Sequence, residues 1–393
     1  MDIKTLAEKY EDYIINQRRW VHQHAELSWQ EFETTAHIKE ELRKMGIEPQ
    51  TFDGLTGCWA MISGGKADES SKTILLRADI DALPTDEATG LPFQSQTKGV
   101  MHACGHDSHV AMLLGATRIL MDIKDELAGN VKLIFQGAEE TAIGAKSYVD
   151  KGILDGVDAT LALHIASWKK SGYFSIPDGP QTASSDQFTV TIHGDACHGG
   201  QPQLGHDAIT TAAAMVMNFQ PLISRENDPR NASIITIGKM EGGYQYNIVA
   251  GKAMLYGNVR DFSKTHRKEV AKRIQEVAKY TAKAYRCTAD VDYEFKTGPI
   301  VHDNLEFNNI VRNAAIKLFG EDVIQNDPPV SGSDDFAYFC ENIPGVFAFL
   351  GGGNKEKNCI YPHHHERFNV DEAAFMKGSA VIAQASYDFL NVK

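Results

Sequence analysis

Apolar positions along the first part of the chain alternate between helical and extended spacing. Helical spacing runs from residue 6 to about residue 45, Gly46 ends it, and residues 20–27 interrupt the period, which predicts two helices. The pattern then predicts strands at 58–62 and 73–81, a helix at 106–121, a strand at 130–136, a helix at 144–151 and a strand at 159–164. Strands interleaved with helices predict an α/β domain.

The middle of the chain has a different pattern. Residues 187–193 alternate apolar and polar positions, as expected for a strand with one side in solvent. The order that follows is helix 207–219, strands 233–238 and 253–261, helix 265–285 and strand 288–295. We therefore expect an inserted α+β domain with an antiparallel sheet at 184–297, between the two parts of the first domain at 1–183 and 298–393.

The last part of the chain is predicted to complete the first domain. Its expected elements are a helix at 305–319, another after Ser333-Asp-Asp-Phe336, a strand at 346–350 and a helix at 371–389.

Composition narrows the functional classes. The 393 residues are 42% hydrophobic and carry a net charge of −13, which argues against nucleic-acid or anionic-membrane partners, since both need clustered Lys and Arg. No window approaches the roughly 18 consecutive apolar residues of a membrane helix. A charged, amphipathic start and six scattered cysteines without a C-x-x-C pair predict a cytoplasmic, reduced protein without a signal peptide.

Candidate chemistry centres on His102-Ala-Cys-Gly-His-Asp107. Cys104 and His106 have the spacing of ligands for zinc or another divalent ion, although a buried cysteine among surface histidines is the alternative. Side chains that follow the predicted strands are expected at the same sheet edge, as an active site requires. They are Asp79 and Asp81, Glu139 and Glu140, and His164.

Adjacent carboxylates such as Glu139 and Glu140 point in different directions at the end of an extended segment. One can bind an ion while the other reaches a water beside it. The alternative is a solvated helix start. For His164 the alternative is a core histidine with satisfied hydrogen bonds, and for residues 363–365, all histidine, it is a solvated turn.

Eight motifs occur in order along nearly the whole chain. They are Arg19-Trp-Val-His-Gln-His-Ala-Glu-Leu27, Leu76-Arg-Ala-Asp-Ile-Asp-Ala-Leu-Pro84, His102-Ala-Cys-Gly-His-Asp107, Phe135-Gln-Gly-Ala-Glu-Glu140, Leu163-His164, Cys197-His-Gly-Gly-Gln-Pro202, Gly257-Asn-Val-Arg260 and Ser333-Asp-Asp-Phe336. With them the chain resembles the bacterial and plant amidohydrolases that include hippurate hydrolases, bacterial aminoacylases and indole-acetyl-amino-acid hydrolases. Ala25, Gly137 and Glu366 stand where those relatives usually have proline.

The resemblance implies a fold and a metal centre. The fold is α/β, a mixed-sheet, three-layer, aminopeptidase-like catalytic domain with an inserted ferredoxin-like dimerisation domain, and hence a homodimer. Two divalent ions are implied, with manganese or zinc favoured and cobalt or nickel allowed. The implied ligands are Cys104 as the bridging ligand, His106, Glu140, His164 and His364, which lies four residues before Phe368, with His363 and His365 as the other choices.

The resemblance also implies roles for residues around the ions. Glu139 resembles the general base that takes a proton from water, and His198 resembles an oxyanion donor that comes from the partner subunit. Asn247 and Arg260 look like groups for the substrate carboxylate, although an ion pair with Asp261 is the alternative for Arg260. Asp79 and Asp81 are expected to orient ligands.

These roles predict an enzyme that hydrolyses N-acyl-amino acids to a carboxylic acid and an amino acid. The nearest alternative is a metallo-dipeptidase or carboxypeptidase, because its substrates also present an amide and a free carboxylate. An alternative of another class is a non-catalytic metal- or ligand-binding protein, which would require the base to be lost.

Overall fold

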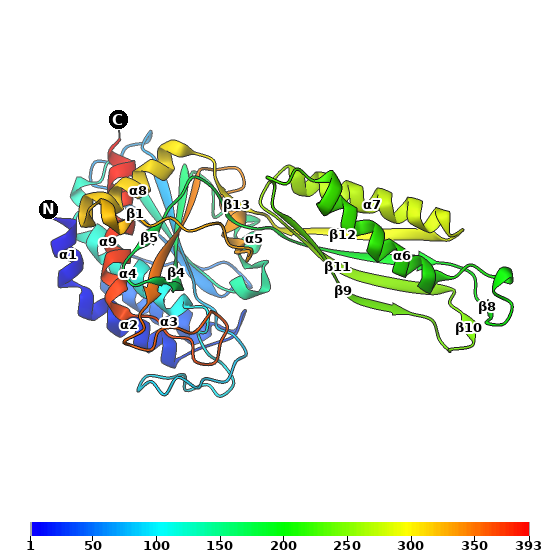
Figure 1. Cartoon of the computed structure of the whole chain (residues 1–393). Helices are drawn as coiled ribbons and strands as arrows, with labels where there is room; N and C mark the ends of the chain where they lie inside the picture. Colours follow the sequence, from blue (N-terminus) through cyan, green and yellow to red (C-terminus); the bar gives the residue numbers. More distant parts are fainter. Residues whose placement is uncertain (1, 393) are drawn as a thin grey trace. The chain divides into compact units, whose positions relative to one another are not determined.

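The computed structural model describes residues 2–392, and the chain divides into two compact units. The first unit comprises the residues up to Gly179, His302–Pro328 and the residues from Asp335 onward. The second comprises Pro180–Val301 and Pro329–Asp334. Figure 1 shows the elements of both units in sequence colours.

The first unit is built on a six-stranded mixed sheet in the order β1-β3-β2-β4-β14-β5. Neighbours among the four central strands pair in parallel, and the two edge strands run antiparallel to their neighbours. The strands are β1 (Gly57–Ser63), β2 (Thr73–Asp79), β3 (Asn130–Gln136), β4 (Ala159–Lys170), β5 (Phe174–Ser175) and β14 (Gly345–Gly353). Every residue of β2 is buried, which explains its continuous apolar run.

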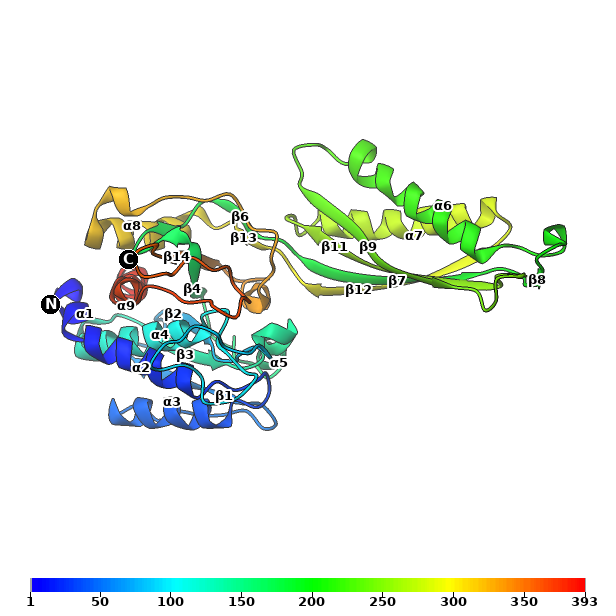
Figure 2. The same cartoon turned by 60° about the horizontal axis from the view of Figure 1, so that its bottom comes forward.

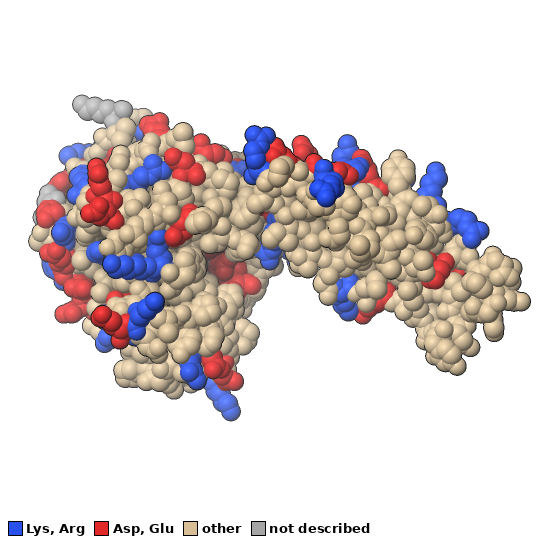
Figure 3. All heavy atoms as spheres, viewed as in Figure 1, with Lys and Arg blue, Asp and Glu red and all other residues tan. Residues whose placement is uncertain are grey.

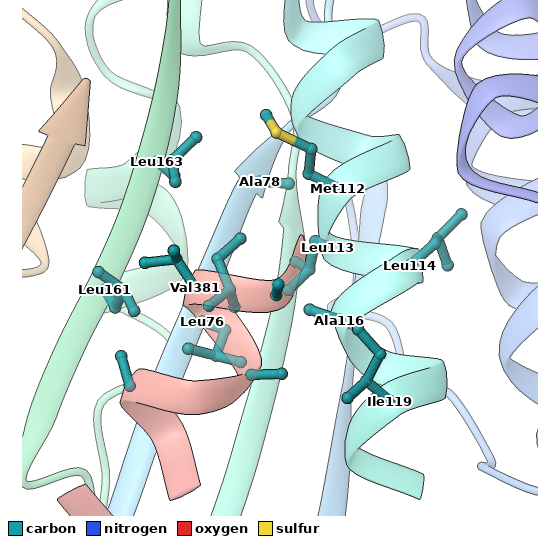
Figure 4. Packing of buried hydrophobic residues seen from close by; sticks show 14 of the residues in the cluster. Leu76, Ala78, Met112, Leu113, Leu114, Ala116, Ile119, Leu161, Leu163 and Val381 are labelled. Carbon is teal, nitrogen blue, oxygen red and sulfur yellow. The ribbon is translucent and has the colours of Figure 1, made fainter. Parts of the chain in front are cut away.

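Helices of the first unit surround this sheet, and the first two of them pack mainly on other helices rather than on its strands. They are α1 (Ile3–Lys9), α2 (Glu11–Gln23), α3 (Phe32–Lys44), α4 (His106–Asp122), α5 (Gly144–Val149), α8 (Leu305–Phe319) and α9 (Phe375–Asn391). Figure 4 shows α4 and α9 over β2 and β4, where the fully buried Leu76, Leu113 and Val381 meet. Removing a side chain of this kind typically costs about 2–5 kcal/mol, so α4 is rigidly held.

The second unit contains an antiparallel sheet in the order β12-β7-β11-β9 with two helices. Its main elements are β7 (Ser185–His193), α6 (Ala208–Pro221), β9 (Ser233–Gly242), β11 (Lys252–Asp261), α7 (His266–Ala284) and β12 (Thr288–Thr297). Figure 2 shows both helices on one face of this sheet. The β-α-β-β-α-β order is the ferredoxin-like arrangement.

Short elements complete the two units. They are β6 (Gly179–Thr182), β13 (Ile300–His302), β8 (Cys197–His198), β10 (Ile248–Val249) and the 3-10 helices Lys124–Glu126, Glu139–Thr141, Pro202–Leu204, Glu321–Val323, Asp335–Tyr338 and Glu372–Ala374, with a π-helical turn at Leu222–Glu226. No helix within residues 2–392 has the length and hydropathy needed to cross a membrane. In Figure 3, Lys and Arg side chains on the visible face are interspersed with Asp and Glu.

Three sequence-based element predictions were wrong. The N-terminal run contains a further break at Tyr10, whose hydroxyl is 2.7 Å from Asp122 Oδ2 on α4, and α2 continues through Gln23. After Ser333 only the 3-10 helix Asp335–Tyr338 forms, because the Asp335 carboxylate binds groups on other elements and Pro344 follows soon. β4 does not end at His164 but continues to Lys170, since β14 pairs alongside it.

Candidate metal centre

The loop before α4 presents Cys104 and His106. Gly105 has φ 91°, and a Cβ there would lie 2.4 Å from Ile165 Cγ2, so only glycine allows the loop to lie against β4. His106 is the first residue of α4, and its Nδ1 lies 2.9 Å from the Asp81 carbonyl oxygen. Because Nδ1 donates to that carbonyl, the Nε2 lone pair of neutral His106 is available to a metal.

Asp81 connects the loop with the two glutamates. Its Oδ1 accepts from the Glu139 N–H (3.1 Å) and lies 3.2 Å from His106 Nδ1. Its Oδ2 accepts from the Glu140 N–H (3.1 Å) and from the Ser28 hydroxyl (2.6 Å). One buried carboxylate therefore fixes both the ring of His106 and the backbone of the Glu139–Thr141 turn.

That turn is entered and left through residues in the left-handed region. Ala138 and Ala142 both have φ 60°, a conformation that costs a non-glycine residue about 1–2 kcal/mol. The Ala138 N–H donates to Glu31 Oε1 (2.8 Å), and the Thr56 hydroxyl donates to Glu31 Oε2 (2.5 Å), so Glu31 holds the turn in place. The strain fits a segment that must aim two carboxylates.

Asp79 supports the neighbouring histidine of α4. Its Oδ1 is 2.5 Å from His109 Nδ1, and its Oδ2 accepts from Arg77 Nη1 at 2.5 Å. His109 Nε2 accepts from the Ile165 N–H (2.9 Å), so both ring nitrogens of His109 are used in the protein. Asp79 Oδ2 also lies 3.6 Å from His106 Nε2.

His164 reaches the thiol from β4. Its Nδ1 donates to the Ile165 carbonyl (2.7 Å), which leaves the Nε2 lone pair facing Cys104 Sγ at 3.7 Å. Both ring nitrogens of His164 thus have partners in this structure, one of them the Cys104 thiol, so its role as a metal ligand stays a prediction.

Two of the three consecutive histidines reach the same place. His364 Nε2 lies 3.7 Å from Glu140 Oε1, and the His364 N–H donates to Ala103 O (2.8 Å). His363 Nδ1 lies 3.6 Å from Cys104 Sγ, but its Nε2 accepts from the Ser167 N–H (3.4 Å), so neutral His363 carries its proton on Nδ1. His365 stacks on Tyr361 instead.

The side chains form two groups that share the thiol. Cys104, His106 and His164 present ligand atoms within 4.8 Å of one another, and so do Cys104, Glu140 and His364. Glu139 joins His106 and Glu140 in a third such group. Within residues 2–392, His106 Nε2 and Glu140 Oε1 are buried polar atoms without a hydrogen-bond partner.

Burial disfavours the charged forms of the candidate ligands. It raises the pKa of Glu140 to about 7 and, together with the Glu140 charge, raises the pKa of the Cys104 thiol well above its usual value. Burial and the nearby His109 lower the pKa of His164. A divalent cation reverses these penalties, because it stabilises thiolate, carboxylate and neutral imidazole together, so the residues fit metal ions.

Three predicted site residues belong to the second unit. His198 on β8 is exposed, and its Nδ1 accepts from the Gly200 N–H (3.0 Å). Asn247 is exposed, and its carbonyl accepts from the Gly199 N–H (2.7 Å). Arg260 on β11 donates to Ser333 Oγ (3.2 Å). The alternative ion pair of Arg260 with Asp261 is not formed, because Asp261 Oδ2 instead contacts His266 Nδ1 (2.6 Å).

A sequence model of Peptidase family M20/M25/M40 matches residues 75–388. The chain belongs to this family. The predicted relationship is confirmed, and so is the enzyme class, a metal-dependent hydrolase acting on amide C–N bonds.

Individual relatives of this M20/M25/M40 protein extend over almost all of it. N-acetyl-L-cysteine deacetylase of Bacillus subtilis is 38% identical, with 99% of this chain and 93% of that protein covered. Thermostable carboxypeptidase 2 of Saccharolobus solfataricus is 35% identical, with 99% and 98% covered. A crystal structure of a Bacillus subtilis protein described as a dinuclear metal binding peptidase from the M20 family has TM-score 0.86 and 32% identity, with 98% and 100% covered. The predicted fold is confirmed.

Sequence reasoning missed two residues that surround Glu139. The Asp335 N–H donates to Glu139 Oε1 (3.3 Å), and the Asp335 carboxylate accepts from Arg77 Nη2 (2.9 Å) and from the Ala145 N–H (2.7 Å). The motif containing Asp335 was visible in the sequence, but nothing local to it indicates a contact about 200 residues away. Glu31 was likewise hidden in a helical pattern.

Proposed function

We propose that this protein is a two-metal amidohydrolase that cleaves N-acyl-amino acids to a carboxylic acid and an amino acid. The observation that carries the proposal is the pair of ligand groups sharing Cys104, one with His106 and His164 and the other with Glu140 and His364. The thiolate and imidazoles suit zinc, and the carboxylates suit manganese, so we propose one of these two metals.

Bound divalent ions supply positive charge that acidifies a water and offsets charge on the amide oxygen. Glu139 is proposed as the general base, because it lies beside the ligand groups and is not needed in either group that contains Cys104. The Asp335 and Asp81 contacts keep its side chain and backbone oriented. Glu139 takes a proton from the water, whose oxygen attacks the amide carbon. Protonated Glu139 then donates this proton to the leaving amine.

His198 is proposed to stabilise the oxyanion from the partner subunit. Its Nδ1 accepts a backbone N–H, so the neutral ring carries its proton on Nε2 and can donate from there. Asn247 and Arg260 are proposed to bind the substrate carboxylate, for which a guanidinium is well suited.

A homodimer in the cytoplasm is part of the proposal. β9 is one of the two outer strands of the second unit's sheet, with unpaired backbone groups along one side. Beside it, α6 contacts β9 and exposes Ile209 and Met217, and β9 exposes Met240 on the helix-covered face. An apolar patch next to a free strand edge suits strand pairing with a second copy of the chain.

The activity test compares Glu139→Gln with wild type on N-acetyl-amino acids, with and without chelator. We expect wild type to lose activity with chelator, and Glu139→Gln to keep its metal content yet lose at least about a hundredfold in kcat. Glu140→Gln is the matched control, since it should lose metal as well. Full activity in Glu139→Gln would refute its role, and metal binding without any turnover would favour the non-catalytic alternative.

The same assay with dipeptides and N-blocked dipeptides tests the alternative function. The relative named thermostable carboxypeptidase 2 makes this alternative specific, because that protein is similar over its whole length. Higher kcat/KM on peptides than on N-acyl-amino acids would replace the proposed substrate class while keeping the metal centre.

Sedimentation of Met217→Asp tests the dimer. We expect wild type to sediment as a dimer and the variant as a monomer, since a buried charge would oppose strand-edge association. Tyr280→Asp on α7 is the control, because Tyr280 is similarly exposed but lies on the other helix. A monomeric wild type, or a dimeric Met217→Asp, would contradict the proposed interface.

A further inference from the structure

The end of β4 carries a bulge beside the candidate metal centre. Ala166 pairs with Gly351 of β14, and Lys170 pairs with Gly353, so four steps along β4 oppose two steps along β14. Three residues of β4, Ser167, Trp168 and Lys169, therefore lie opposite Gly352 alone and leave the regular ladder. Bulges next to active sites commonly redirect a side chain.

Trp168 is the side chain that this bulge turns outward. Ser167 and Lys169 are each 5% exposed, whereas Trp168 is 53% exposed. The Lys169 ammonium is held by Asp327 (2.8 Å), and the Ser167 N–H by His363, so both flanking residues are anchored. An exposed indole on an anchored backbone is a rigid apolar surface.

The imidazole ring of His363 lies between the Trp168 indole and the Cys104 thiol. Its ring centroid is 5.1 Å from that of His363, whose Nδ1 is 3.6 Å from Cys104 Sγ. Phe349 of β14 supports the indole edge-on at 5.6 Å between centroids. The aromatic surface is thus continuous with the ligand groups.

A cavity of about 720 Å³ opens beside Trp168 within the first unit. Trp168, Ile360, Gly353, Lys170 and Lys355 are among its lining residues. Its volume lies in the range of small-molecule sites, about 300–1,000 Å³. Its walls therefore combine one large aromatic ring with a polar rim that carries both lysines and carboxylates.

We propose that Trp168 is a specificity-determining residue that stacks on a flat, apolar acyl group of the substrate, which this cavity receives. The inference rests on the proposed function, in which the reacting amide lies at the ligand groups of the first unit and its acyl half extends beside them. An acetyl group ends one carbon beyond the reacting carbonyl, whereas an aromatic acyl group extends further and offers a flat face on which an indole can stack.

The test compares N-benzoylglycine with N-acetylglycine, using metal-loaded wild type, Trp168→Ala and Trp168→Phe. Loss of an aromatic stacking partner should lower kcat/KM for the benzoyl substrate at least about fivefold in Trp168→Ala, mainly through KM. The acetyl substrate should change by less than about twofold, and Trp168→Phe should restore most of the benzoyl activity. Phe32→Ala removes an exposed aromatic elsewhere in the first unit and should change neither substrate.

Binding of benzoate and acetate, followed by calorimetry, gives a readout that does not depend on turnover. Trp168→Ala should weaken benzoate binding and leave acetate binding unchanged. Equal losses for both acyl groups, or no loss for either, would overturn the role of Trp168 while the proposed function stands. Wild type that hydrolyses neither substrate would overturn the proposed function, and the inference with it.

Discussion

Replacing Asp81 by asparagine tests how the candidate metal centre is held together. Four donors surround the two carboxylate oxygens, namely His106 Nδ1 and the Glu139 N–H at Oδ1, and the Glu140 N–H and Ser28 hydroxyl at Oδ2. Asp81 is 1% exposed, so water does not substitute for any of them.

The expected loss of stability in Asp81→Asn depends on the orientation of the asparagine amide. With its NH2 at the Oδ2 position, Ser28 can turn its hydroxyl to accept, but the Glu140 N–H then faces another donor. One buried N–H left without an acceptor costs about 1–3 kcal/mol. Asp81→Ala leaves all four partners without the carboxylate and should cost more than Asp81→Asn, whereas Ser28→Ala removes a single bond and should cost about 1 kcal/mol.

Metal affinity should fall together with stability. With the amide in this orientation the substitution loosens the backbone of Glu140, a member of one of the two ligand groups that contain Cys104. Loss of such a supporting contact typically weakens metal binding about 10–100-fold. We therefore expect this range for Asp81→Asn, and less than about threefold for Ser28→Ala, whose contact reaches no ligand directly.

Urea unfolding of the metal-free proteins gives the stability change, and calorimetric titration with Mn²⁺ or Zn²⁺ gives the affinity. The reasoning fails if Asp81→Asn binds metal as tightly as wild type, or if Ser28→Ala is as damaging as Asp81→Asn. Either outcome would mean that Glu140 is oriented by contacts other than this carboxylate.

Two further predictions follow from the same neighbourhood. Burial raises the pKa of Glu31 to about 7, so its native pKa lies above its unfolded one, and the stability it confers at low pH is lost as pH rises through 7. Between about pH 5 and 8, the free energy of unfolding of the metal-free protein, measured with urea, should fall by about 3 kcal/mol more in wild type than in Glu31→Gln. Parallel pH curves for the two proteins would contradict this. His364→Ala should lose one metal per subunit while His363→Ala keeps both, because neutral His363 holds its proton on the nitrogen facing Cys104; metal analysis showing the reverse would exchange their roles.

Much of the fold could be predicted from the sequence because its elements have strong local signals. The fully buried β2 appears as an unbroken apolar run, and α6 begins directly after its N-cap Asp207, whose side chain accepts from the Ile209 and Thr210 N–H groups. The failures came where long-range contacts set an element's length. The Tyr10 hydroxyl donates a hydrogen bond to α4, pairing with β14 extends β4, and the Asp335 carboxylate accepts a hydrogen bond from Arg77.

The sequence by itself determined which groups are available to the centre. The spacing of Cys104 and His106, the adjacent glutamates and the consecutive histidines are local features, and their types already indicate metal chemistry. The sequence does not determine which nitrogen of each histidine has its lone pair directed toward the thiol. This depends on hydrogen bonds to Asp81, Ile165 and Ser167.

Only the tertiary structure decided those hydrogen bonds, and with them the difference between His363 and His364. The same holds for Trp168, since its exposure comes from a bulge that exists only where β4 meets β14. The physical reason is common to both cases. Residue type fixes what a side chain can donate or accept, but its direction and solvation are set by partners distant in sequence, which no local pattern encodes.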